Sequence, residues 1–408
     1  MVNKNSNINL RFNLESVFVL YAGLTMAVYI LPSLKITVPY IYAALLMLAF
    51  LPIAVIKMQC HINYYVLLAV TTLVSSAFYF VNGVYGSVDT INEIIRFLRF
   101  FLPIIWAAYA FRFCSAKQRR NILIIFAVIM LFILIKTIHA LEKDAWIARI
   151  LAQDKSTDTS EIRAYRMGNV GGFEFSYMVG VVVLCLTWAA LKYRNIKAKI
   201  LCIVGAAVCF YYIIKTMYMT LLLLTFVGVL LLLFFKTKSK LVKIVVVLGS
   251  IVVAFSLTPM FKYLSKVFSG SLLSTKFMQF YTALTGGGAD SLGSRPELIR
   301  EAVARWLKSP IWGGYETSVR THSMVFALLE ATGLIGLLSF LGCLFGSYKM
   351  ISDELKKNGI DTLLISTVFM YILALAALNP VSYVFEVTIA AFFIAPLWSE
   401  WICDRNET

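Results

Sequence analysis

The fold is decided by residues 200–235, whose sequence is ILCIVGAAVCFYYIIKTMYMTLLLLTFVGVLLLLFF. This stretch is apolar almost throughout, and Lys215 is its only charged residue. A helix needs about 20 apolar residues to cross the roughly 30 Å of hydrocarbon in a bilayer, so this stretch is too long for one span. We therefore expect two membrane-spanning helices, joined near Lys215 by a very short outer connection.

Similar apolar runs recur along the whole chain. Of its 408 residues, 60% are hydrophobic and 14% are charged, and the mean hydropathy is +0.83. Soluble globular domains are about half apolar and about a quarter charged. The sequence thus predicts an all-α integral membrane protein, with one polytopic transmembrane domain over residues 1–408. About twelve spans are expected, near residues 16–33, 36–56, 63–82, 97–113, 121–140, 174–191, 200–214, 217–235, 242–259, 323–346, 361–379 and 383–399.

Basic residues in the short connections set the expected orientation. Lys and Arg accumulate in the cytoplasmic loops of membrane proteins. Here they precede span one or follow an even-numbered span, which predicts a bacterial inner-membrane protein with both termini in the cytoplasm. The net charge of +16 is then a signal of topology, and no nucleic-acid partner is expected. The clusters contain Lys4, Arg11, Arg112, Lys117, Arg119, Arg120, Lys192, Arg194, Lys197, Lys199, Lys236, Lys238, Lys240, Lys243, Lys349, Lys356 and Lys357.

The longest connection, residues 260–322, lies between spans nine and ten and is predicted to be a large helical periplasmic loop. Its run Ser294-Arg295-Pro296-Glu297 is a capping box with an early proline, which is typical of a helix start. We expect the following helix to lie on the membrane surface or to pack on the bundle, and to end near Pro310. Its apolar face contains Leu298, Ile299, Ala302, Val303 and Trp306.

Arginines are frequent on the predicted outer side. A guanidinium group binds phosphate oxygens through two parallel hydrogen bonds, which suits a phosphate or diphosphate ligand. A plainer alternative is that long loops escape the charge bias and that some arginines pair with Glu93, Glu161, Glu297 or Glu301. The outer cations are Arg96, Arg99, Arg163, Arg166, Arg295, Arg300, Arg305 and Arg320, with Lys136 and Lys215 at the outer ends of spans.

Glycines follow two of these arginines. Gly168, Gly171 and Gly172 come directly after Arg163 and Arg166. Because glycine lacks a Cβ, it lets a backbone approach a ligand closely. Simple turn chemistry is the alternative.

Among the three histidines, His322 is the natural general base, because it lies where the long basic loop re-enters the membrane and its unperturbed pKa is near neutrality. His61 and His139 are expected in packing or interfacial roles. Glu316 and Glu330 are the next candidate bases.

Four ionisable residues fall within the expected spans, namely Lys136, Lys215, Glu330 and Glu386. Such residues are costly in lipid and are functional candidates, although Lys136 could instead pair with Glu330 or Glu386. The seven cysteines form no CxxC or other metal-site spacing, so no metal or other cofactor is expected.

These motifs resemble those of the O-antigen polymerases (Wzy type) and O-antigen ligases of bacterial envelope synthesis. His322-Ser323, nine residues, then Gly333-Leu334-Ile335-Gly336 is similar to the signature of these enzymes. Upstream, Gly293-Ser294-Arg295 and Ser309-Pro310 with Gly313-Gly314 look like the run that the family carries in its large outer loop. The chain departs from the family at Lys215-Thr216-Met217-Tyr218, where a Thr-x-[Ser/Thr]-Arg run is common.

The resemblance implies inverting glycosyl transfer, without metal, from an undecaprenyl-diphosphate-linked glycan donor to a glycan acceptor at the periplasmic face. His322 would be the catalytic base. The diphosphate would be bound by cations among Arg295, Arg166, Arg163, Lys215, Arg320 and Arg96, with Arg300 a secondary candidate. Membrane lipid, a chain-length regulator and a flippase are the further partners.

Two other functions remain open at this level. A ligase would transfer the glycan to lipid A core; polymerisation of repeat units is preferred because residues 314–322 are too few to recognise that acceptor. A lipid-linked oligosaccharide flippase, a transporter, should instead distribute midplane charges between two halves.

Overall fold

The computed structural model describes residues 14–49, 102–144, 146–152, 159–237, 239–270, 272–285, 295–313, 323–378 and 385–407. Within these ranges the chain forms helices and turns and no strand, which confirms the all-α class. The helices are α1 (Leu14–Ile30), α2 (Pro32–Thr37), α3 (Tyr40–Ala49), the helix Leu102–Phe113, α7 (Ala116–Lys143), α8 (Ile147–Ala152), α9 (Ser160–Met167), α10 (Phe173–Lys192), α11 (Ile196–Thr216), α12 (Met219–Lys236), α13 (Lys240–Val267), α14 (Leu272–Leu284), α15 (Arg295–Trp306), α16 (Met324–Lys357), α17 (Leu363–Leu378), α18 (Phe385–Ile389), the π-helix Ala390–Ile394 that follows it, and α19 (Ala395–Glu407).

Six helices of the described part are long and apolar enough to cross a membrane, and three shorter ones are also apolar. This supports a helical membrane protein, whereas the count of twelve spans and their orientation stay predictions. Expected span 63–82 lies outside the described residues, as do parts of the spans at 36–56 and 97–113. The hairpin expected near Lys215 is confirmed, because α11 ends at Thr216 and α12 begins at Met219.

The centre of the bundle is α10, which packs against α11, α12, α17, α18 and α19. Two glycines allow close helix packing. A Cβ at Gly180 would lie 2.6 Å from the hydroxyl of Tyr371, and one at Gly228 would lie 2.7 Å from Leu184. Small residues at helix contacts are typical of membrane bundles, where packing replaces the hydrophobic effect as the source of association.

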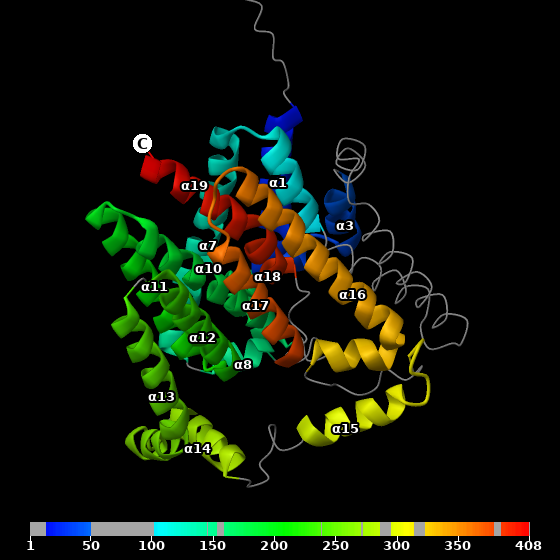
Figure 1. Ribbon diagram of the computed structural model, residues 1–408. Helices are drawn as coiled ribbons and strands as arrows, with labels where there is room; N and C mark the ends of the chain where they lie inside the picture. Colours follow the sequence, from blue (N-terminus) through cyan, green and yellow to red (C-terminus); the bar gives the residue numbers. More distant parts are fainter. Residues whose placement is uncertain are drawn as a thin grey trace, which may run out of the picture.

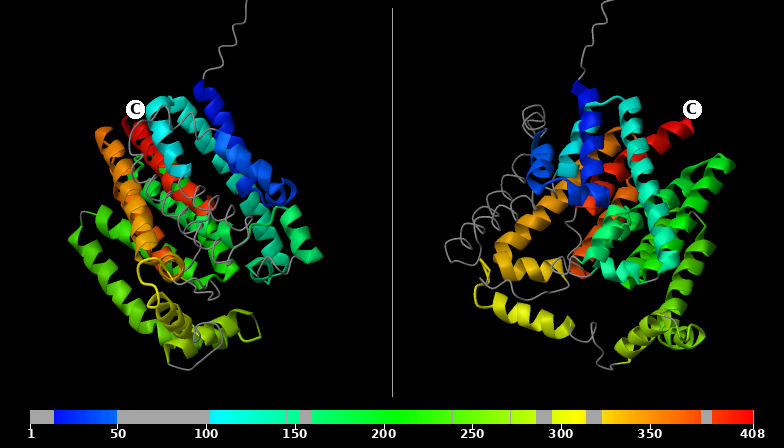
Figure 2. Two further views of the ribbon diagram at one scale, coloured as in Figure 1. Left: turned by 90° about the vertical axis from the view of Figure 1, so that its right-hand side faces the viewer. Right: turned by 180° about the vertical axis from the view of Figure 1, so that it is seen from behind.

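Different parts of the chain lie at the two ends of the helix bundle (Figures 1 and 2). The first described residues of α1 and the last of α19 lie at one end, whereas α14 and α15 lie at the opposite end. The helices α14 and α15 belong to the predicted loop 260–322, whose first residues instead continue α13 as far as Val267. Pro259 is accommodated inside that helix.

Span ten differs from the expected continuous helix over 323–346. Gly333 has φ +62° and ψ −161°, so it breaks α16 into a short segment, Met324–Thr332, and a long one that ends at Lys357. The short segment runs at an angle to the long one (Figure 1). The apolar stretch that could cross a membrane is Thr332–Lys357, which moves the expected span toward the C-terminus.

Candidate functional site

The expected site residues divide into those that the structure describes and those that it does not. His322, Glu316, Arg320 and Arg96 lie outside the described residues, and Arg295 begins α15 with its side chain undescribed. Arg163, Arg166, Lys215, Arg300 and Glu330 are described.

The break in α16 is where the long loop attaches. The Leu334 N–H donates to the Pro310 carbonyl at 2.9 Å, and the Ile335 N–H donates to the Ile311 carbonyl at 3.3 Å. A Cβ at Gly333 would lie 2.3 Å from the Ile311 oxygen, so only glycine fits there. Gly333 therefore admits the backbone of the loop after α15.

The second glycine of the same motif serves the same break. A Cβ at Gly336 would lie 1.8 Å from Oγ1 of Thr332, the residue just before the break. The Thr332 hydroxyl itself donates to the Leu328 carbonyl at 2.8 Å. The chain thus turns between the two segments of α16 at a motif whose two glycines, Gly333 and Gly336, leave room for this break.

An ion pair reinforces this attachment. Arg305 of α15 contacts Glu330 of α16 at 3.3 Å, and Glu330 is only 2% exposed. Arg305 also lies 3.7 Å from Glu301, one of the glutamates named as an alternative partner for the arginines. The suggested pairing of Lys136 with Glu330 was wrong; Lys136 instead lies over the ring of Phe132 at 5.9 Å.

The apolar face expected on α15 is confirmed. Ala302 is buried, its four apolar companions are half-buried, and α15 packs against α16. Arg300 is exposed on the other side of this helix.

Arg163 and Arg166 lie on the short helix α9, which ends in a left-handed cap. Asn169 has φ +59°, its N–H donates to the Arg166 carbonyl, and the Val170 N–H donates to the Tyr165 carbonyl. This pair of bonds is a Schellman motif, with asparagine in the position that usually requires glycine. Arg166 is half-buried and Arg163 is exposed.

The neighbouring glycines serve turn and packing roles. Gly171 donates to the Thr137 hydroxyl at 2.7 Å, and a Cβ on it would lie 2.4 Å from Phe175. Gly168 is the C-cap of α9 and has a negative φ of −71°. Turn chemistry, the alternative considered from sequence, accounts for these residues.

A charge cluster that the sequence did not predict lies beside α9. The side chain of Asn169 accepts from the Ser33 hydroxyl at 2.7 Å, which docks α9 on α2. From α2, Lys35 then forms ion pairs with Glu174 at the start of α10 and, at 2.7 Å, with Glu386 at the start of α18. One ammonium group thus ties the end of α2 to the starts of α10 and α18. Glu386 is 4% exposed. The suggested pairing of Glu386 with Lys136 was therefore also wrong.

Nothing in the local sequence could have linked these residues. Glu386 was singled out as a carboxylate within an apolar stretch, whereas Lys35 resembles an ordinary cation between two spans. Their sequence separation is 351 residues, so only the tertiary structure joins them.

Lys215 lies at the end of α11, over the ring of Tyr211 at 5.5 Å. The hydroxyl of Tyr211 is 3.5 Å from Glu142. In the following turn Tyr218 packs its ring against Phe173 at the start of α10, with centroids 4.9 Å apart. The α11–α12 turn is thereby held against the same end of α10 that carries Glu174.

Other ion pairs join helices at the opposite end of α10. Asp361, before α17, contacts Lys192 and Lys236 at 3.2 Å each. Partial burial opposes ionisation of Asp361, but the Leu363 N–H and the Lys192 ammonium outweigh it and hold its pKa below the ordinary value of 3.8. The carboxylate is thus held charged between two lysines.

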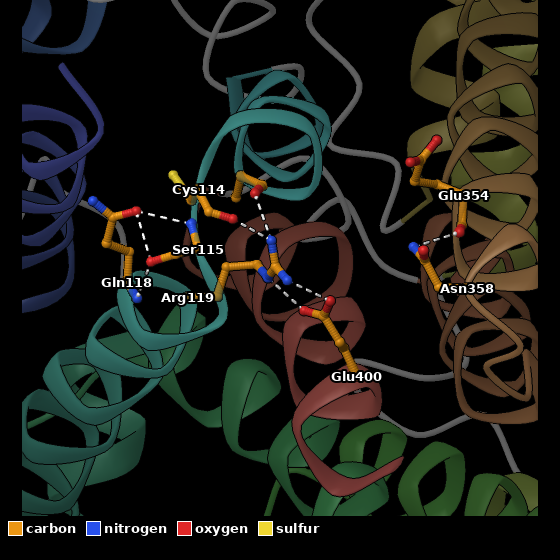
Figure 3. Close-up of polar contacts among 8 residues, drawn as sticks. Cys114, Ser115, Gln118, Arg119, Glu354, Asn358 and Glu400 are labelled. Carbon is orange, nitrogen blue, oxygen red and sulfur yellow. Dashed lines mark hydrogen bonds and ion pairs between the residues drawn. The ribbon is translucent and has the colours of Figure 1, made fainter. Parts of the chain in front are cut away.

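Arg119 of α7 forms a second junction near α19. It makes a two-point ion pair with Glu400, at 2.6 and 2.7 Å, and donates to the carbonyls of Ala110 and Cys114 (Figure 3). Ser115 and Gln118 form a reciprocal capping box that fixes the start of α7 beside it. In the described part of the chain, no three His, Cys, Asp or Glu side chains are grouped to hold a metal ion.

These features define the class of protein as a polytopic helical membrane protein whose charged residues meet at the helix ends. No protein-family model matches this chain, and a search of curated proteins finds no match either.

Proposed function

We propose that the protein is a glycosyltransferase that polymerises undecaprenyl-diphosphate-linked oligosaccharide repeat units into O-antigen or capsular polysaccharide at the periplasmic face of the inner membrane. The main support for this proposal is a contact between two of the motifs that resemble the polymerase and ligase family, namely the Ser309-Pro310 run and the Gly333–Gly336 run. Pro310 and Ile311, from the loop run, accept hydrogen bonds from Leu334 and Ile335 of the glycine run. Residues far apart in the pattern thus form one structural unit, which the short helical segment Met324–Thr332 connects to Ser323.

The chemistry follows from the residue types. A base at His322 takes the proton of the acceptor sugar hydroxyl, whose oxygen attacks the anomeric carbon of the donor. The bond from that carbon to the diphosphate breaks on the opposite side, which inverts the configuration, and undecaprenyl diphosphate leaves. Its departing negative charge requires cations more than an acid, and arginines at the bundle end supply them.

The arginines of α15 do not all have the same role. Arg305 is occupied by Glu330 and Glu301, so it holds the loop on α16. Arg295 begins the same helix, where backbone N–H groups already favour an anion. We therefore assign diphosphate binding to Arg295, with Arg163 and Arg166 from α9, and loop attachment to Arg305. Because Glu330 is already paired, His322 is preferred over it as the base.

Complementation of a polymerase-deficient strain that makes the cognate lipid-linked repeat unit tests this proposal. A positioned base contributes about 10²–10⁴-fold, so His322→Ala should abolish visible long-chain polymer at normal protein level. Arg295→Lys should impair it strongly, because a point charge does not reproduce a guanidinium fork. The matched control is His139→Ala, since His139 is exposed at the end of α7.

Three outcomes would contradict the proposal. Normal polymer from His322→Ala would remove the base. Transfer of glycan to lipid A core by the purified protein, without chain growth, would identify a ligase. Movement of intact lipid-linked oligosaccharide across proteoliposomes, without any new glycosidic bond, would identify a flippase.

A further inference from the structure

A helical hairpin lies at the end of the bundle that is remote from the described termini (Figures 1 and 2). It consists of the last two turns of α13, residues 260–267, and of α14, which folds back against them; we call it the α13–α14 hairpin. Phe277 stacks on Phe261 with ring centroids 5.9 Å apart, and the Ser274 hydroxyl donates to the Ser265 carbonyl at 2.6 Å. The two helices are thus held together by contacts of their own.

The hairpin begins where α13 reaches the membrane surface. α13 has 28 residues and is about 42 Å long at about 1.5 Å per residue, whereas the hydrocarbon of a bilayer is about 30 Å thick. The expected span within this helix, residues 242–259, starts beside the basic residues Lys240 and Lys243. The last eight or so residues of α13, roughly the two turns of the hairpin, therefore lie at the opposite membrane surface or beyond it.

One face of the hairpin is apolar and exposed. Met260, Tyr263 and Val267 share this face at helical spacing, and they are 38%, 67% and 54% exposed. Phe268, in the turn after α13, and Met278 of α14 are exposed as well. The apolar face of α15, in the same predicted loop, is instead packed on α16. Apolar side chains gathered and exposed on so small a unit mark a contact surface.

Lysines lie beside this apolar face. Lys262 and Lys266 are one turn apart and exposed, and Lys262 lies over the ring of Tyr281 at 5.3 Å. The sequence from residue 260 to 285 contains a third lysine, Lys276, and no Asp or Glu. Because the charge bias of membrane proteins disfavours lysine on the predicted outer side, that bias does not account for these residues. The surface that complements the hairpin is therefore apolar and negatively charged.

We propose that the α13–α14 hairpin lies in the headgroup region of the membrane leaflet at this end of the bundle. Met260, Tyr263 and Val267 contact the upper parts of the acyl chains. Lys262 and Lys266 contact the phosphates of anionic lipids, which long lysine side chains reach from an apolar surface. Tyrosine is likewise typical of the membrane–water interface, and the continuity of α13 with its span places the hairpin at this depth. The inference does not depend on the proposed glycosyl transfer.

The test uses the full chain in nanodiscs of phosphatidylglycerol and phosphatidylcholine in equal amounts. Tyr263→benzoylphenylalanine introduces a photoreactive side chain at an exposed position, and mass spectrometry of the intact protein identifies the adduct after illumination. We expect a lipid adduct, as with the same change at Val128, which is 63% exposed within the candidate span α7. The same change at Lys357, whose side chain is 70% exposed in the last turn of α16, should give no lipid adduct.

The lysines are tested through the identity of the lipid adduct. Each basic residue near an anionic lipid surface contributes about 1 kcal/mol, which corresponds to about fivefold in affinity. We expect phosphatidylglycerol adducts to predominate, and Lys262→Gln/Lys266→Gln to lower their ratio to phosphatidylcholine adducts about 25-fold. Because Lys262 also contacts Tyr281, Lys266→Gln alone is the second variant, with about a fivefold decrease expected. The control Lys356→Gln/Lys357→Gln removes the same charge from the end of α16 and should leave the ratio unchanged.

Three results would overturn the proposal. The absence of a lipid adduct at position 263, with one present at position 128, would place the hairpin in water. An adduct with a second copy of the chain or with another protein would make the hairpin a protein-binding surface. An unchanged adduct ratio in both lysine variants would remove the contact with anionic headgroups.

Discussion

Replacing Gly333 with alanine should detach the long loop from α16. The backbone at Gly333, with φ +62° and ψ −161°, is in a region that is essentially restricted to glycine, and forcing another residue into it costs about 1–3 kcal/mol. The new Cβ would also lie 2.3 Å from the Ile311 oxygen and 2.6 Å from the Gly313 nitrogen. Both are backbone atoms, so neither can rotate away as a side chain could.

The loop must therefore move, and two hydrogen bonds are lost with it. These are the bonds from Leu334 to Pro310 and from Ile335 to Ile311, each contributing about 0.5–1.5 kcal/mol. Strain and lost bonds together amount to roughly 2–6 kcal/mol at this one junction. Because a whole protein is stable by only about 5–15 kcal/mol, local opening should precede global unfolding.

Hydrogen exchange of the purified protein measures this opening directly. In Gly333→Ala, amides around Leu334 and in α15 should lose protection, whereas those of α10 should not. Gly342→Ala is the matched control, because Gly342 lies in the same helix and a Cβ there meets nothing within 4 Å. That variant should be stabilised slightly, by about 0.5–1 kcal/mol. Equal protection of Leu334 in both variants would refute the role assigned to the break.

Other predictions concern the ion clusters. Lys35→Met leaves two facing carboxylates and should lower the Tm strongly. Breaking a buried ion pair costs about 3–5 kcal/mol in unfolding free energy, and the cost here should be smaller because Lys35 is partly exposed. Adding Glu386→Gln should restore much of the loss, and no restoration would contradict the cluster. Arg119→Lys should cost about 1–3 kcal/mol in unfolding free energy, because lysine cannot keep both the fork to Glu400 and the backbone contacts, and an unchanged Tm would argue against that geometry. Because the pKa of Asp361 lies below 3.8, its stabilisation is complete above that pH and is lost as the pH falls below it, so Asp361→Asn should flatten the acid limb of a Tm–pH curve.

The sequence predicts local structure well where one physical rule dominates. Apolar runs of sufficient length indicated the helices, and the single charge of residues 200–235 indicated the hairpin. The amphipathic spacing of α15 indicated the face that packs on α16. Each of these signals is contained within a few turns of chain, so no knowledge of tertiary contacts is needed.

The candidate site could be predicted less completely, because its decisive features depend on contacts across the chain. Gly333 lies in an apolar run, where a glycine is ordinarily read as part of a continuous helix. Only the approach of Ile311 shows that a break is required. In the same way, Glu330 and Glu386 were recognised as costly intramembrane carboxylates, but their cations, Arg305 and Lys35, come from segments that the sequence does not place beside them.

The arrangement of these ion pairs favours a fixed catalytic site over alternating access. A flippase rocks one part of its bundle against another, so contacts at one face open while those at the other close. Here α10 is tied at both ends, through Glu174 to Lys35 and through Lys192 to Asp361. Both junctions are formed together, which holds α2, α10, α17 and α18 as one scaffold. The arm that bears α15 is likewise attached to α16, by the hydrogen bonds to Pro310 and Ile311 and by the Arg305–Glu330 ion pair. Such a scaffold suits the proposed glycosyl transfer, in which donor and acceptor must be held in a fixed geometry.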